Sequence, residues 1–383
     1  RDLHSFPTRR SSDLHIVYSL ARWDRVGVHY HSLFQFLLMG LNGAFLTGDL
    51  FNLFVFFEVL LAASYGLLLH GSGTARVKPG LHYVVVNLVG SLFFLIGAAL
   101  IYGVSGTLNM ADLAVQIPAL APGDRGLFEA GAAILGVAFL VKAGSWPLNF
   151  WLPPAYAAAG APVAAVFSIM TKVGIYAVLR IGSLLAASSA PAPFAGQWLL
   201  YIGLATMVFG IVGMLGSQRL GRIIGFAVIV SSGTVLAAVG LDAAGLMAPA
   251  LFYLLTSALT TAAFFLLIGM TERTRTQVSV LDDAAPLPPA TYKAFGVEEP
   301  PLHAVDEEVG IAIPAAMAFL GLAFLFCAVL VTGLPPLSGF LAKFALVSAA
   351  LAVAPEVSLG TWMLVAALLA YMEIGRASCR ERV

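Results

Sequence analysis

The sequence predicts an all-α, multi-pass membrane protein, because it is much too apolar for a water-soluble domain. Of its 383 residues, 60% are hydrophobic and only 10% are charged, and the mean hydropathy is +0.93. In soluble domains, about a quarter of the residues are charged. The apolar residues also gather into stretches of about 20 residues, the length that a membrane-spanning helix needs. In addition, prolines interrupt two of these stretches close to a lysine.

Composition also argues against several classes of function. The formal net charge is zero and there is no long basic run, so nucleic acid is not an expected partner. Cys327 lies in an apolar stretch and Cys379 in the last ten residues, so neither a disulfide framework nor a cysteine metal site is expected. No flavin, nicotinamide or iron–sulfur motif is present. The sequence therefore predicts no cofactor, no metal and no redox enzyme in its own right.

The two ends of the chain differ from the sequence beside them. Residues 1–14 and 374–383 are polar and rich in arginine. One strand of a DNA that resembles a sequencing adaptor translates as His4–Leu14, and its reverse complement translates as Ile374–Val383. The alternative, a basic targeting arm, would leave this match to coincidence. We therefore expect both ends to be adaptor artefacts and residues 15–373 to be an internal fragment of a longer membrane domain.

Residues 15–373 contain about ten apolar stretches that could span a bilayer. The first two are joined by Thr47, Gly48 and Asp49, which are typical of a tight turn. The fourth and ninth stretches are broken, and the tenth is cut short. The ranges are 32–48, 50–69, 82–103, 128–152, 162–184, 197–217, 221–241, 246–270, 312–352 and 359–372.

The charges of the connecting loops predict the orientation. When the loops are assigned to alternate sides, one side carries only Arg125 and, at a helix end, Arg180. Lysine and arginine favour the cytoplasmic side, so the basic side is expected to be cytoplasmic and the protein to lie in the inner membrane. The longest polar loop, residues 271–310, is then a cytoplasmic linker. The basic side carries Arg22, Arg25, Arg76, Lys78, Arg219, Arg222, Arg273, Arg275 and Lys293.

The spans divide into two halves, residues 32–184 and 197–372, and each half contains one broken span. Pro147, Pro153 and the adjacent Pro154 interrupt the first, and Pro335 and Pro336 interrupt the second. Proline removes a backbone donor, and a broken helix at membrane depth is tolerated only where it is buried in protein or lines a wet cavity. The breaks fall in the fourth and ninth spans, which would cross in opposite directions. This pattern is typical of inverted-topology repeats.

Glu58 and Lys142 are the first candidate functional pair. Glu58 lies among phenylalanines and leucines, so its carboxylate should be either protonated or paired with a cation, for which Lys142 and Lys172 are available. Pairing would keep Lys142 charged, whereas loosening the contact would favour the neutral amine, because burial disfavours charge. Such a pair would be a proton switch. The alternative is a fixed pair that only locks two helices together.

Lys172 and Lys343 are the other candidates for proton transport. A charge at the centre of a bilayer costs about 2.5 to 3.5 kcal/mol on insertion scales, so it usually faces a partner or water. Lys172 lies about ten residues inside its span, which argues against the alternative that it snorkels to the interface. Lys343 follows the second break, in TGLPPLSGFLAKF. Charges beside broken helices together indicate an ion path.

These residues lie in segments that resemble a known family. TGDLFNLFVFFEVLLAASYGLLLHG, VKAGSWPLNFWLPPAYAAAGAPVAAVFSIMTKVGIYAVLRIGSLL, LGRIIGFAVIVSSGT and GLPPLSGFLAKFALVSAALA are similar to the antiporter-like, proton-translocating subunits of Mrp-type multisubunit Na⁺/H⁺ antiporters and respiratory complex I. Within the Mrp type, the similarity is strongest to the component called MrpD. It implies that Glu58 and Lys142 are the family's essential glutamate and its lysine partner. Lys172 and Lys343 would be the next two lysines of the path.

One position departs from the family pattern. Where the family usually has a histidine in its eleventh helix, this chain reads LFYLLTSALTTAAFF, with Thr256 in the expected place. Threonine can hydrogen-bond and orient water, but it has no titratable group. A relay between Lys172 and Lys343 would therefore need water.

Three functions follow from the sequence and the resemblance. The first is a proton-translocating subunit of an antiporter that exchanges Na⁺ for H⁺ and works only with partner subunits. The second is an antiporter-like subunit of a complex I-type NADH dehydrogenase or a membrane hydrogenase. The third is a non-conducting scaffold, against which the insertion cost of the four intramembrane charges argues.

Overall fold

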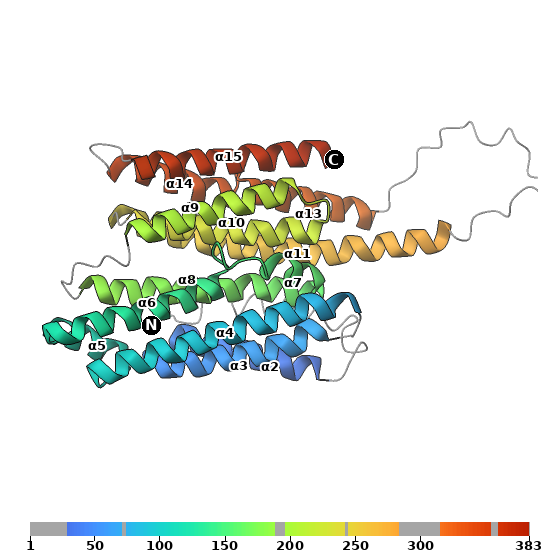
Figure 1. The fold of residues 1–383 in the computed structure, drawn as a ribbon. Coiled ribbons are helices and arrows are strands. Elements are labelled where there is room, and N and C mark those ends of the chain that lie inside the picture. Colours follow the sequence, from blue (N-terminus) through green and yellow to red (C-terminus); the bar gives the residue numbers. More distant parts are fainter. Residues whose placement is uncertain are drawn as a thin grey trace, which may run out of the picture.

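The structure, a computed structural model, describes residues 29–70, 74–187, 196–241, 244–282, 315–353 and 359–382. Within these ranges the chain is a bundle of helices whose axes run roughly along one direction (Figure 1). The helices of the first half lie on one side of the bundle and the last helices of the second half on the other (Figure 1). This arrangement confirms the predicted all-α membrane fold.

The first half consists of α2 to α8. Asp49 forms the N-cap of α3, because its side chain accepts a hydrogen bond from the Asn52 amide at 2.9 Å. The short helix α5 was not expected; it begins where the Asn109 side chain caps two amides. The bounds are α2 Tyr30–Leu46, α3 Leu50–Leu69, α4 Thr74–Ser105, α5 Met110–Ala119, α6 Pro122–Ala143, α7 Leu152–Ala158 and α8 Ala161–Ala187.

The second half consists of α9 to α15. Its longest helix, α11, continues to Asp282, so the first twelve residues of the predicted linker at 271–310 are helical. The rest of that linker lies outside the described residues. The bounds are α9 Gln197–Leu215, α10 Leu220–Gly240, η3 Ala244–Leu246, α11 Met247–Asp282, α13 Ala315–Thr332, α14 Ser338–Val353 and α15 Leu359–Arg382.

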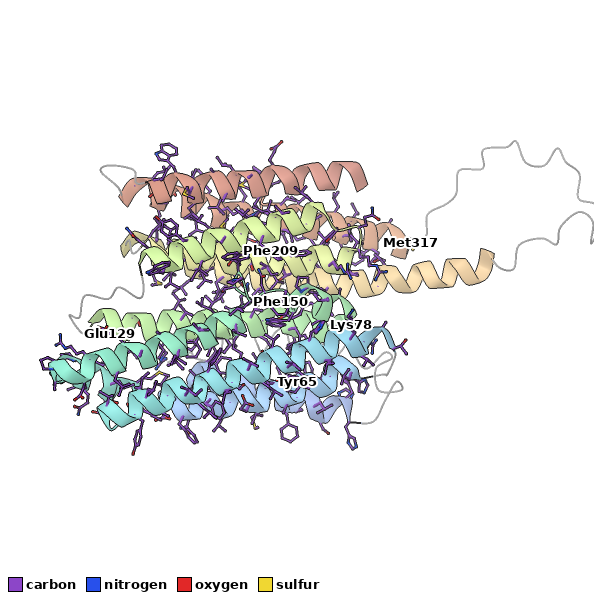
Figure 2. The ribbon with its side chains drawn as sticks, viewed as in Figure 1. Tyr65, Lys78, Glu129, Phe150, Phe209 and Met317 are labelled. Atoms are coloured by element: carbon purple, nitrogen blue, oxygen red, sulfur yellow. The ribbon has the colours of Figure 1, made fainter. Side chains whose placement is uncertain are left out.

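Seven of the described helices are long and apolar enough to cross a membrane, namely α3, α4, α6, α8, α9, α10 and α11. The other predicted spans hold shorter apolar helices: α2, the pair α13 and α14, and α15. The pair is short because each member runs only to the break between them. Lys78 and Glu129, near the starts of α4 and α6, lie at opposite ends of the bundle (Figure 2).

Both predicted breaks are present, and both begin at a glycine. Gly144 ends α6 with φ 66° and Gly333 follows α13 with φ 77°, a left-handed conformation that glycine adopts without strain. Pro147 lies in the first break, and Pro335 and Pro336 lie in the second. Pro153 stands slightly differently from the prediction, because it occupies the first turn of α7, where proline is well tolerated.

The centre of the bundle is formed by α8 and α10. In each, 83% of the apolar span is buried within the protein, whereas the other five long spans are no more than 50% buried. α8 packs against α6, α10 and α11, so it connects the two halves. Gly174 makes the contact with α6 possible, since a Cβ there would lie 2.6 Å from the Ala143 amide nitrogen. The lysine of α8 is therefore placed at the middle of the molecule.

Candidate functional site

Lys142 is buried in the last turn of α6, next to the first break. Its Nζ donates hydrogen bonds to the main-chain oxygen of Asn87 and to the Ser91 hydroxyl, each at 3.1 Å. It also lies 5.9 Å from the centre of the Phe57 ring, within range of a weak cation–π contact. Asn87 and Ser91 are themselves buried and bonded within α4. The ammonium is thus solvated mainly by α4.

Glu58 lies on α3 and does not form the direct pair with Lys142 that the sequence suggested. Its Oε1 atom is buried and makes no hydrogen bond among the described residues. The carboxyl group is nevertheless close enough to Lys142 and to Tyr65 to interact with both electrostatically. The physical reason for the missing contact is that α4 already supplies two acceptors to the ammonium. Figure 2 shows Tyr65 on α3, the helix that carries Glu58.

Lys172 is 2% exposed in the middle of α8. Its Nζ donates a short hydrogen bond to the hydroxyl of Ser231 on α10. That hydroxyl in turn donates to the main-chain oxygen of Val228 at 2.8 Å. Because the ammonium ends inside the bundle on a neighbouring helix, the snorkelling alternative does not describe its position. Lys172 instead links the first half to the second.

Lys343 is 2% exposed on α14, directly after the second break. Its Nζ donates to the main-chain oxygens of Val331 at 2.9 Å and Thr332 at 2.8 Å, in the last turn of α13. The same atom lies 4.1 Å from the centre of the Tyr371 ring, a close cation–π contact from α15. A Cβ on Gly333 would lie 2.9 Å from this Nζ, so the glycine also leaves room for the lysine.

A small polar cavity lies between these last two lysines. Its volume is about 20 Å³, which is enough for one water molecule. It reaches from Ser231, which holds Lys172, to Lys343, and Thr256 is in its wall. The residues that line it are Ala227, Ser231, Tyr253, Thr256, Ser257, Thr260, Thr261, Leu330, Val331, Gly339, Lys343 and Tyr371.

Thr256 lies in this cavity wall with its hydroxyl turned to its own helix. Its Oγ1 is within hydrogen-bond distance of the main-chain oxygens of Phe252 and Tyr253, at 3.0 and 3.2 Å. A hydroxyl that donates to its own helix keeps lone pairs with which to accept. Thr256 can therefore orient water in the cavity, although it cannot itself gain or lose a proton there.

Several residues that hold the lysines were not found from the sequence. Asn87 and Ser91 bind Lys142, Ser231 binds Lys172, and Tyr371 covers Lys343. Thr206 on α9 was also missed, although it accepts a hydrogen bond from the Trp146 amide in the first break at 2.9 Å. The one available signal was that each is a polar or amphipathic residue inside an apolar span. That signal is weak, because serine and threonine are common in membrane helices.

This geometry defines a class of protein. Lysines buried beside broken helices, with a polar cavity between them, are typical of membrane proteins that translocate ions. Comparison with known families agrees: residues 47–291 match the family described as "NADH:quinone oxidoreductase/Mrp antiporter, TM". The match covers more than half of the chain, and the chain belongs to this family.

Two curated relatives, both D-type components of cation/H⁺ antiporters, are similar along most of the chain. The chain is 60% identical over 333 residues to a probable K⁺/H⁺ antiporter component of this type from Rhizobium meliloti (strain 1021), which covers 86% of this chain. It is 36% identical over 328 residues to the corresponding Na⁺/H⁺ antiporter component of Alkalihalophilus pseudofirmus, which covers 85% of this chain. In both comparisons the chain spans 60% of the relative's length.

Solved structures agree with the fold. The structure of the Mrp complex from Dietzia sp. DQ12-45-1b matches 96% of this chain and 63% of its own chain, with a TM-score of 0.75 and 28% identity. A membrane-bound sulfane sulfur reductase, described as an archaeal respiratory membrane complex, matches 95% of this chain and 68% of its own chain, with a TM-score of 0.76 and 27% identity. Respiratory complex I from Thermus thermophilus shares the fold at 23% identity and a TM-score of 0.70.

Proposed function

We propose that the chain is a proton-translocating part of a multisubunit antiporter that exchanges a monovalent cation for H⁺. The observation that carries this proposal is the polar cavity between Ser231 and Lys343. Ser231 already holds Lys172, so the cavity continues the line of polar groups from one half of the bundle into the other. A scaffold would gain nothing from burying three ammonium groups along such a line.

The proposed path has four titratable groups in chain order. Glu58 is an acid without a described hydrogen-bond partner on Oε1, and it biases the charge of Lys142 from a distance. Lys172 exchanges protons through the Ser231 hydroxyl, and Lys343 receives them by way of water in the cavity beside Thr256. Each lysine has only one or two described hydrogen-bond acceptors, so burial makes the neutral amine accessible at each step.

The partners follow from the relatives. Both are named as antiporter subunits, one for K⁺ and one for Na⁺, and the Mrp match is a complex. We therefore propose that this chain assembles with other subunits in the cytoplasmic membrane, surrounded by lipid, and that H⁺ and either Na⁺ or K⁺ are its ions. Its role is transport, without a cofactor of its own.

A second candidate is a subunit of a redox-driven complex. The observation in its favour is the similarity to the archaeal respiratory membrane complex, whose TM-score of 0.76 is as high as that of the Mrp complex. The same lysine path would then move protons at the expense of electron transfer elsewhere in the assembly. The two candidates differ in what drives the flux.

Proton flux in liposomes that contain the purified complex separates the two candidates. We expect that a gradient of Na⁺ or K⁺, with no electron donor present, moves protons in the opposite direction, because an antiporter couples the two ions directly. A pH-sensitive dye inside the liposomes measures this flux, and liposomes without protein are the control. Proton flux that requires an electron donor and ignores both cations would contradict the antiporter and support the redox complex.

A further inference from the structure

The ammonium of Lys343 differs from the other two in what holds it. Both of its hydrogen bonds go to main-chain oxygens, those of Val331 and Thr332, at the C-terminal end of α13. A helix C-terminus carries partial negative charge on its unpaired carbonyls. In transporters, the carbonyl ends of broken helices are also the groups that coordinate Na⁺. The lysine therefore occupies a position that would suit an alkali cation.

The cavity beside this position supplies further oxygen atoms. Thr260 donates its hydroxyl hydrogen to the main-chain oxygen of Thr256 at 2.7 Å, and Thr261 donates to that of Ser257 at 2.8 Å. Ser257 donates to the main-chain oxygen of Leu254 at 3.1 Å. With their hydrogens used within α11, these hydroxyls can offer only lone pairs to the cavity. Hard cations prefer such neutral or charged oxygen ligands.

The charge of the pocket sets a limit on its occupant. Among the described residues that line the cavity, none is a carboxylate and Lys343 is the one cation. The titratable groups around it are Tyr253 of α11 and Tyr371 of α15, while α10 and α13 contribute a serine hydroxyl and apolar side chains. The pocket is therefore built for a single positive charge, whichever group carries it.

We propose that the carbonyl end of α13 and the hydroxyls of α11 form a binding site for one alkali cation, which competes with the protonated Lys343 for the same oxygens. When Lys343 gives its proton to water in the cavity, the amine becomes neutral and one cation enters. When a proton returns, the ammonium takes back the carbonyls and the cation leaves. One positive charge is present in both states, so the exchange is one for one. This site rests on the proposed antiport and assigns its cation step.

Removing a hydroxyl from the cavity wall tests the site without altering Lys343. In liposomes with the assembled complex, we expect Thr260→Val and Ser257→Ala each to raise the half-saturating concentration of Na⁺ or K⁺ about tenfold, because each loses one oxygen ligand. Thr260→Ser keeps the hydroxyl and should stay near the wild type. Thr271→Val is the matched control, since Thr271 lies on α11 but outside the cavity lining.

The competition supplies a second measurement on the wild-type complex. More acidic medium should raise the half-saturating cation concentration, because protonated Lys343 excludes the cation, and this rise should be measured for both ions. If Thr260→Val and Ser257→Ala bind and exchange cations with wild-type half-saturation, the site is wrong, although antiport itself stands. A wild-type complex without any cation-dependent proton flux would instead refute the antiport on which the site rests.

Discussion

Glu58→Ala is expected to abolish cation-driven proton flux while the subunit still reaches the membrane at its normal level. In the structure, Lys142 donates its hydrogen bonds to Asn87 and Ser91 on α4, so loss of the carboxyl group leaves the ammonium with both of its acceptors. What is lost is the nearby negative charge that favours the charged lysine. The measurement pairs proton flux in liposomes with the amount of subunit in the complex.

The same measurement decides between a switch and a lock. If the pair locked two helices together, removal of one charge would leave the other buried and unpaired, at a cost of about 3 to 5 kcal/mol. The subunit would then fail to assemble. Glu58→Asp keeps the charge and should keep part of the flux, and Glu129→Ala removes an exposed acid of α6 as the control. Loss of flux fully explained by loss of protein would reject the switch.

Gly174→Val is expected to prevent assembly almost completely. A Cβ at this position would lie 2.6 Å from the Ala143 nitrogen and 2.9 Å from the Lys142 carbonyl carbon. Both atoms belong to the main chain of α6, so a helix, and not a side chain, would have to move. Overpacking of this kind costs on the order of 3 kcal/mol or more. Because α8 joins the two halves, the damage should spread to both.

The control for this substitution lies on the same helix. A Cβ on Gly182 would meet nothing within 4 Å, so Gly182→Val changes the chemistry and the helix propensity equally without the clash. The amount of subunit in the purified complex, together with its thermal stability in detergent, measures the effect. Equal levels for the two variants would show that α8 does not need its close contact with α6.

Most of the fold could be predicted from the sequence because the bilayer imposes simple rules. Apolar length located the spans, and proline located both breaks, as Pro147 and Pro335 illustrate. The four charges of the site were also conspicuous, since a charge in an apolar span is rarely without a role. The short helix α5 was missed because it is too short to span and its start depends on the cap at Asn109.

The contacts of the site could not be predicted in the same way. The sequence suggested that Glu58 would pair with Lys142, but the acceptors of that lysine lie 55 and 51 residues away on α4. Ser231 and Tyr371 look like ordinary residues of membrane helices until the packing of α8, α10 and α15 brings them to a lysine. Such contacts depend on how the helices pack, which apolar periodicity does not specify.

Lys172 offers the most direct test of the whole account, because its side chain connects the two halves. Lys172→Met keeps the length and apolar stem of the side chain but removes the ammonium that bonds Ser231. The measurement is cation-driven proton flux in liposomes, normalised to the amount of assembled complex. A single path through both halves predicts that this flux falls to the level of liposomes without protein. Near-normal flux from a fully assembled Lys172→Met complex would contradict it, because protons would then cross without passing this position.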